Sequence, residues 1–203
     1  MLSKLYKEVK VIIYIYCGLL LFVLSTNISF FQNFILQSES TLNLINFILV
    51  AESIIFYIYI FATIWFVYKS QLYNLERGVK DLKYSAKWIW IWWWIPFLNL
   101  WMPYKVVKET YLSSFKTKKE YFNYSDKNIF WSWWGSFVLA LLSPVIGRTY
   151  IRVNYYEQFP PEYYELILPF EIASGLLIIF SAFSFLQIIK QISKNEILTV
   201  KRK

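Results

Sequence analysis

The sequence lacks several residue types on which common enzyme chemistry depends. Its 203 residues include no histidine, which excludes His-based acid–base catalysis, Ser-His-Asp triads and imidazole metal sites. The single cysteine, Cys17, excludes both an internal disulfide and a cysteine-rich metal site. Five glycines are present, and none belongs to a GxGxxG or P-loop sequence. We therefore expect no catalytic residues, no cofactor and no metal.

Apolar and aromatic residues are in excess. Hydrophobic residues make up 58% of the chain and aromatic residues 22%, whereas soluble domains are about 45–50% apolar. The net charge of +8 comes from basic residues that flank long apolar blocks. We therefore expect anionic lipid headgroups, and not nucleic acid, to be the counter-charge. The composition predicts a single membrane domain over residues 1–203.

Four apolar blocks are long enough to cross a bilayer core of about 30 Å. They cover residues 9–28, 44–68, 129–147 and 166–189. The first block follows a basic start and has no A-x-A cleavage site after it, so we interpret it as a retained signal anchor. We predict an all-α integral membrane helical bundle with these four transmembrane helices.

A fifth apolar run, WIWIWWWIPFLNLWMPYK at Trp88–Lys105, differs from the four blocks. Its uninterrupted part, residues 88–102, would reach only ~22 Å as a helix, less than the thickness of the core. Pro96 would break a straight helix, and Pro103 suits a new helix start. The run predicts a Pro-broken segment that is re-entrant or interfacial, in which Asn99 satisfies local backbone groups.

The distribution of lysine and arginine distinguishes a crossing from a return. If the tryptophan run crosses the membrane, the two sides carry 10 and 11 basic residues, and if it returns they carry 19 and 2. The positive-inside rule favours the second arrangement. We therefore predict that the run returns to the side it left and that both termini lie in the cytoplasm.

The residues after Pro103 suggest a short amphipathic helix. Tyr104, Val107, Tyr111 and Phe115 recur at helical spacing, with lysines mainly elsewhere around the helix. This pattern is typical of a cationic helix in the membrane interface. A helix packed on the bundle is the alternative. The predicted re-entrant or interfacial region is thus residues 88–115.

Three ionisable residues lie in or beside the predicted spans, toward the outer side: Glu52, Arg148 and Glu171. A charge in a span costs about 2.5–3.5 kcal/mol on insertion scales, so it normally has a partner. One hypothesis is an intramembrane polar site in which Arg148 pairs with Glu171 or Glu52. In the alternative, Arg148 and Glu171 lie among the headgroups and Glu52 makes an ordinary interhelical hydrogen bond.

One face of the fourth block carries small residues at intervals of three or four: Ser132, Ser136, Ala140, Ser143 and Gly147. Such a face allows two helices to approach closely. We expect it to serve packing inside the bundle, with oligomerisation as the alternative.

The motif WWWIPFLNLWMPYKVVKE resembles the signature of a family of uncharacterised bacterial membrane proteins, the domain of unknown function 4328. That signature runs roughly W-W-x-x-P-x-x-N-L-W-x-P-Y-x-x-x-x-E. The matching residues are Trp93, Trp94, Pro96, Asn99, Leu100, Trp101, Pro103, Tyr104 and Glu109. WFVYKSQLYNL and FWSWWGSF are also similar to segments of the family. The resemblance implies a multi-pass protein of the bacterial inner membrane and no assigned activity.

Two classes of function fit these observations best. The first is a non-enzymatic module that recruits a protein partner or senses the envelope, with the family motif as a structural or docking face. The second is a small transporter, channel or lipid-binding protein, monomeric or homo-oligomeric, that uses the Pro-broken segment and Glu52. An intramembrane enzyme is a third class, but no spacing pairs a nucleophile with a base.

Overall fold

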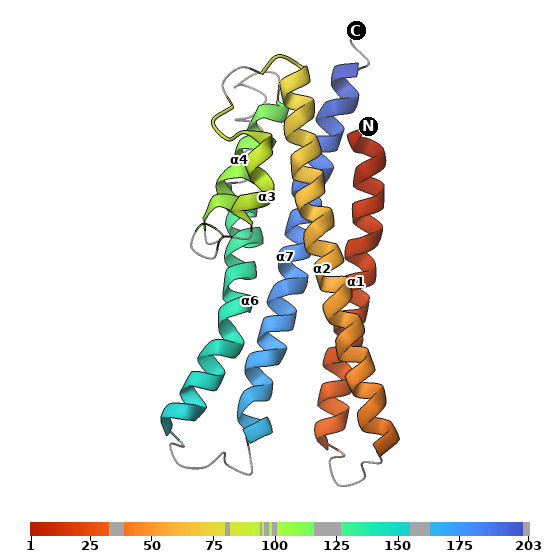
Figure 1. Ribbon diagram of the computed structural model, residues 1–203, viewed down its shortest axis with the longest axis vertical. Helices are drawn as coiled ribbons and strands as arrows, with labels where there is room; N and C mark the ends of the chain where they lie inside the picture. Colours follow the sequence, from red (N-terminus) through yellow and green to blue (C-terminus); the bar gives the residue numbers. More distant parts are fainter. Residues whose placement is uncertain are drawn as a thin grey trace.

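Four long helices form the protein in the computed structural model, which describes residues 1–32, 39–79, 82–93, 95, 98, 101–115, 127–154 and 163–200. They are α1 (Leu2–Gln32), α2 (Glu39–Glu76), α6 (Lys127–Asn154) and α7 (Tyr163–Val200) (Figure 1). Each contains a stretch long and apolar enough to cross a membrane: Leu2–Ser25, Val50–Glu76, Asn128–Asn154 and Leu166–Glu196. The described residues form no strand. The predicted all-α membrane bundle with four spans is confirmed.

Each helix continues beyond the apolar block that predicted it. The second block ends at residue 68, whereas α2 continues to Glu76, and the last block covers 166–189 within the longer α7. Hydropathy marks the residues that suit lipid, but a helix continues for as long as its backbone hydrogen bonds and its packing are maintained. The polar extensions of α2 and α7 lie at the end of the bundle where both chain termini are found (Figure 1). We call this end the terminal end.

The small-residue face of α6 packs against α7 in antiparallel orientation. Ser143 donates a hydrogen bond to the Phe170 carbonyl at 2.8 Å, and Ser174 donates one to the Ala140 carbonyl, also at 2.8 Å. Nearer the terminal end, the Ser181 hydroxyl donates to the Trp133 carbonyl at 2.7 Å. Such close approach is what small residues allow. The face thus serves packing inside the bundle, as the sequence predicts.

α1 lies between α7 and α2. On one side, Leu24 packs against Gly175 of α7, where an added Cβ would meet the leucine side chain at 2.7 Å. On the other side, Tyr16 stacks on Tyr59 of α2 with ring centroids 5.2 Å apart. Direct packing therefore joins the four long helices in the order α6, α7, α1 and α2.

Three short helices lie beside the terminal half of the bundle: the 3₁₀ helix η2 (Ala86–Trp88), α3 (Ile89–Trp92) and α4 (Met102–Ser114). We call them together the aromatic segment. Figure 1 shows α3 and α4 beside the upper half of the bundle. Trp90 packs against Phe61 and Trp65 of α2, and Trp93 packs edge-on against Trp134 of α6 at 6.0 Å.

The aromatic segment returns to the end of the bundle from which it starts. It follows the end of α2, and at its own end the Ser114 carbonyl accepts a hydrogen bond from Arg77, one residue past α2. The described part of the tryptophan run therefore does not extend along the length of the bundle. Its re-entry into the membrane stays a prediction, and Pro96 and Asn99 lie outside the described residues.

α4 packs on the bundle, which is the alternative that its sequence pattern left open. The helix begins at Met102 with Pro103 in its first turn, as predicted. Val106, Val107 and Thr110 are completely buried against its neighbours, α2, α7 and α6. The helix thus contributes to the core as well as to the surface of the terminal end.

We expect Gly147→Ala to destabilise the protein and Gly135→Ala on the same helix to leave its stability unchanged or slightly increased. A Cβ at position 147 would lie 2.7 Å from the Phe170 ring, whereas one at position 135 meets nothing within 4 Å. Overpacking of this kind costs ~1–3 kcal/mol. Thermal unfolding of the purified variants in one detergent measures the difference. Equal midpoints would show that the α6–α7 contact does not require glycine.

Candidate functional site

Buried polar side chains gather at the terminal end of the bundle. Burial of a polar group costs free energy unless it forms hydrogen bonds, so such a cluster must have its partners inside the protein. The cluster draws on α2, α4 and α7, and we call it the terminal polar network: Ser70, Gln71, Asn74, Thr110, Ser114, Ser193 and Glu196.

The carboxylate of Glu109 on α4 joins the network to the non-helical residues before η2. Its Oε1 atom accepts a hydrogen bond from the backbone N–H of Lys83 at 2.6 Å. Its Oε2 atom accepts one from the backbone N–H of Tyr84 at 3.1 Å and one from Gln71 Nε2 at 3.0 Å. Hydrogen bonds to an ionised carboxylate are stronger than those between neutral groups. Glu109 thereby fixes the start of the aromatic segment against α2 and α4.

Gln71 and Asn74 of α2 extend this network. Gln71 Nε2 also donates to the carbonyl of Tyr84 at 3.2 Å, and its Oε1 atom accepts from the Thr110 hydroxyl at 3.2 Å. One turn further along α2, Asn74 Nδ2 donates to the Thr110 carbonyl at 3.3 Å. The amide groups of Gln71 and Asn74 therefore bind α2 to α4 through side chains and backbone at once.

The end of α2 directs the chain back toward Glu109. Gly78 has a φ of 78°, a left-handed conformation that glycine adopts without steric cost. The Val79 N–H donates to the Asn74 carbonyl at 3.2 Å, and the Gly78 N–H donates to the Leu75 carbonyl at 2.9 Å. These two bonds are the pattern of a Schellman cap. Gly78 thus stops α2 and allows Lys83 and Tyr84 to reach Glu109.

α1 and α7 join the network through a second buried carboxylate. Glu196 Oε1 accepts from the amino group of Met1 at 3.0 Å, and its Oε2 atom accepts from the backbone N–H of Ser3 at 3.0 Å. One residue earlier, Asn195 Nδ2 donates to the Ser114 hydroxyl at 2.9 Å. The network therefore joins α1, α2, α4 and α7 at one end of the bundle.

The family-motif residues that the structure describes have different environments. Trp93 and Pro103 are buried, Tyr104 packs edge-on against Phe130 at 6.3 Å, and Glu109 is in the network. Trp101 precedes α4 and is exposed. The other four motif residues lie outside the described part of the chain: Trp94, Pro96, Asn99 and Leu100. Glu109 is thus the motif residue for which the structure shows a clear polar role.

The predicted polar site of Glu52, Arg148 and Glu171 does not form an ion pair among the described residues. Arg148 is exposed on α6, and Glu171 is half-buried on α7. Glu52 is half-buried on α2 and approaches the hydroxyl of Tyr16 on α1. No salt bridge in the described part of the chain joins Arg148 to either carboxylate. The grouping of these three residues into one site stays a prediction.

Sequence reasoning missed Gln71, Thr110 and Glu196. A signal was present for Gln71, because Phe66, Val67, Ser70 and Gln71 continue one buried face of α2 at helical spacing. A polar residue on a face that is otherwise apolar indicates a buried hydrogen bond. Thr110 and Glu196 have no such local signal, because their partners come from other helices.

The chemistry of the terminal polar network indicates a structural role, in which hydrogen bonds hold neighbouring helices and loops together. Both Glu109 and Glu196 accept hydrogen bonds from backbone N–H groups of the protein itself. No group of three or more potential metal ligands of the His, Cys, Asp and Glu types occurs among the described residues. The network therefore serves to place the exposed residues around it.

Comparison with known families was made on the whole chain. A family model described as Domain of unknown function (DUF4328) matches residues 38–194. The chain belongs to the DUF4328 family. The resemblance inferred from the tryptophan motif is confirmed at the level of the family. No curated protein and no solved structure matches the chain.

The matched range defines which contacts lie inside the DUF4328 domain. It includes the aromatic segment, α2, α6 and most of α7, and therefore the whole cluster around Glu109, Gln71 and Thr110. It does not include α1 or Glu196. The contacts of Glu196 thus attach α1 to a domain whose own helices are already joined by the hydrogen bonds around Glu109.

We expect Glu109→Gln to loosen the aromatic segment, because an amide nitrogen would face donors that now bind a carboxylate oxygen. An unsatisfied buried group costs ~1–3 kcal/mol, which increases local opening. The measurement uses a Cys17→Ser background with a cysteine at Ala86, which is buried. In Glu109→Gln this cysteine should react with maleimide about tenfold faster or more.

Glu76→Gln is the matched control, because Glu76 is exposed in the last turn of α2 and the substitution removes the same charge. It should leave the reactivity of the cysteine at position 86 unchanged. Equal reactivity in both variants would show that Glu109 does not hold the segment.

Proposed function

We propose that this DUF4328 protein is a non-enzymatic, multi-pass module of the bacterial inner membrane that recruits an acidic protein partner to its terminal end. In this proposal both termini lie in the cytoplasm, and the aromatic segment is re-entrant on that side. The part of the segment that faces the cytoplasm forms the docking surface together with the basic residues around it.

The observation that carries the proposal is the charge of the terminal end. Seven lysines are exposed in the described part of the terminal half, and they come from α1, α4, α7 and the residues in and before η2: Lys4, Lys7, Lys83, Lys87, Lys105, Lys190 and Lys194. Two carboxylates at the same end, Glu109 and Glu196, are used inside the terminal polar network. The exposed lysines outnumber the exposed carboxylates of this end, Glu8 and Glu76, so the outward field is positive and attracts an acidic partner or anionic headgroups.

Exposed tryptophans favour a protein partner beside those lysines. Trp88 is 52% exposed and Trp101 is 44% exposed, and both belong to or border the aromatic segment. Tryptophan is common at the centres of protein interfaces, where its large ring binds with little loss of conformational freedom. Because Glu109 fixes the segment in advance, docking would not have to order it.

A small transporter, channel or lipid-binding protein is the second candidate function. Its lipid-binding form is favoured by an apolar groove between α1 and α2, which is described in the next subsection. A transport path that uses both the Pro-broken segment and Glu52 would have to join two different regions of the bundle. Glu52 lies at the α1–α2 interface, whereas α4, which follows the Pro-broken segment, packs on α2, α6 and α7.

We expect cysteine labelling in intact cells to place both ends of the aromatic segment in the cytoplasm. In a Cys17→Ser background, single cysteines replace Ser85, Asn128 and Asn154, all of which are exposed. An impermeant maleimide should label position 154 from outside, and positions 85 and 128 only after the cells are permeabilised. Labelling of position 128 from outside, with position 85 protected, would mean that the run crosses.

Photo-crosslinking in cells tests the docking surface. A photoreactive amino acid at Trp88 should give one protein adduct of defined mass, whereas the same amino acid at Val145, exposed on the other half of α6, should give none. Lys87→Glu should lower the yield at position 88 by about fivefold, because a charge pair at an interface rim is worth ~1 kcal/mol.

Arg152→Glu is the control for this charge reversal, since Arg152 is exposed in the last turn of α6, far from the terminal end. It should leave the yield unchanged. The docking proposal is wrong if position 88 crosslinks only to lipid, or if both charge reversals act equally. An adduct with a second copy of the chain would replace partner recruitment by self-association.

A further inference from the structure

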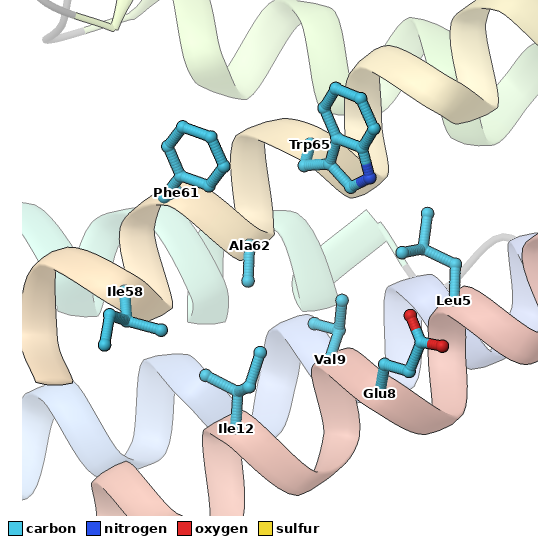
Figure 2. A pocket seen from close by; sticks show the side chains of 8 residues that line it. All are labelled: Leu5, Glu8, Val9, Ile12, Ile58, Phe61, Ala62 and Trp65. Atoms are coloured by element: carbon cyan, nitrogen blue, oxygen red, sulfur yellow. The ribbon is translucent and has the colours of Figure 1, made fainter.

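A groove of about 330 Å³ lies between α1 and α2 near the terminal end. Figure 2 shows Val9 and Ile12 rising from α1 toward Ile58 and Ala62 on α2. Leu5, Phe61 and Trp65 complete the apolar lining, and Glu8 alone among the eight lining residues carries a charge. The volume is at the lower end of the range of ligand sites, about 300–1,000 Å³.

One charged residue interrupts the apolar lining of the groove. Leu5 and Ile12 are seven residues apart on α1, so the groove extends about 10 Å along the helix axis. Glu8 lies at the terminal side with the basic start of the chain, and Ile12 and Ile58 lie deeper in the candidate spans. The groove is therefore apolar along its length, with the single charge of Glu8 in its terminal half.

One lining residue of the groove is charged, and a residue of opposite charge lies beside another lining residue. The Glu8 carboxylate is exposed on α1, and in the described part of the chain no salt bridge neutralises it. On α2, the Lys69 ammonium lies 4.6 Å from the centre of the Trp65 ring, a cation–π contact that holds it beside a lining residue. The groove thus has an acceptor for a cation on α1 and, on α2, a cation beside one of its lining residues.

We propose that this groove binds one phospholipid whose headgroup carries a primary ammonium, of the phosphatidylethanolamine class. One acyl chain lies on the apolar floor between Ile12 and Ile58. The ammonium donates hydrogen bonds to Glu8, and the phosphate lies near Lys69. The site is distinct from the docking surface, because none of its lining residues belongs to the aromatic segment, although Phe61 and Trp65 also pack against Trp90.

The charge pattern selects this lipid among the common classes. An anionic lipid without an amine would leave Glu8 unpaired and would bring its own negative charge close to it. A choline headgroup carries the same charge as an ethanolamine headgroup but has no N–H to donate, and a carboxylate accepts hydrogen bonds only. Glu8 therefore distinguishes headgroups both by charge and by hydrogen bonding.

Native mass spectrometry of the full-length protein tests the proposal. The protein is purified in a mild detergent and mixed with equal amounts of phosphatidylethanolamine, phosphatidylglycerol and phosphatidylcholine of the same chain length. One retained phosphatidylethanolamine should exceed each competitor by about fivefold, which corresponds to ~1 kcal/mol. Equal retention of the three lipids, or preference for the glycerol or choline headgroup, would overturn the assignment.

Glu8→Gln tests the headgroup contact. It should reduce the preference for phosphatidylethanolamine to less than about twofold, because the amide has lost the charge that attracts the ammonium. Glu76→Gln, which removes another exposed carboxylate of the terminal end, should keep the preference. A preference that survives Glu8→Gln would place the lipid elsewhere.

Ile58→Trp tests the acyl-chain contact. Ile58 is 47% exposed, so the larger ring can be accommodated at the surface and cover the floor of the groove. The variant should lose at least about four-fifths of the retained lipid, as a tenfold weaker site would. Ile54→Trp, one turn away at a position of 55% exposure that does not line the groove, should retain it. Equal retention by both variants would contradict the proposal.

Discussion

The three hydrogen bonds accepted by Glu109 are the constraint on which the arrangement of the terminal end depends. Residues between α2 and η2 leave the helix, so their backbone N–H groups need acceptors beside an otherwise apolar bundle. The carboxylate supplies acceptors for Lys83 and Tyr84 and also binds Gln71. Without it, the chain after Gly78 would have no fixed route back to the core. The positions of Ile89, Trp90 and Trp93 against α2 and α6 all follow from this attachment.

Hydrogen bonds between polar groups and the packing of aromatic rings have complementary roles in this bundle. Between apolar helices in lipid, the hydrophobic effect does not distinguish one arrangement from another, so close packing and hydrogen bonds must do so. The α6–α7 pair uses small residues and serine hydroxyls, as in the contact of Ser143 with the Phe170 carbonyl. The terminal end uses carboxylates and amides, and the large rings fill the space around them. A rigid terminal end is suited to presenting exposed lysines and tryptophans in a constant geometry.

The number and place of the spans could be predicted because each apolar block is a property of consecutive residues. Chain length and Pro96 also indicated that the tryptophan run is not a fifth span, and the described part of the run does lie beside one half of the bundle. The ends of the helices could not be predicted in this way, because Gln71 and Asn74 are polar residues that are nevertheless buried against α4. Glu109 could be named from the family motif, but its acceptor role depends on a loop 25 residues earlier that approaches it in space. The groove at Glu8 depends on the spacing of two helices, which no single segment encodes.

The attachment of α1 to Glu196 has a consequence for the order in which the protein is assembled. α1 and α2 are consecutive and pack together, and so are α6 and α7, so each pair can form as soon as its second helix is synthesised. The contact between Ser3 and Glu196 spans 193 residues and can form only when the last helix has emerged. Until α7 is present, the side of α1 that later packs on α7 would contact lipid instead. The contacts of α1 with α7 therefore form only after α7 is synthesised, which couples them to a late stage in the synthesis of the chain.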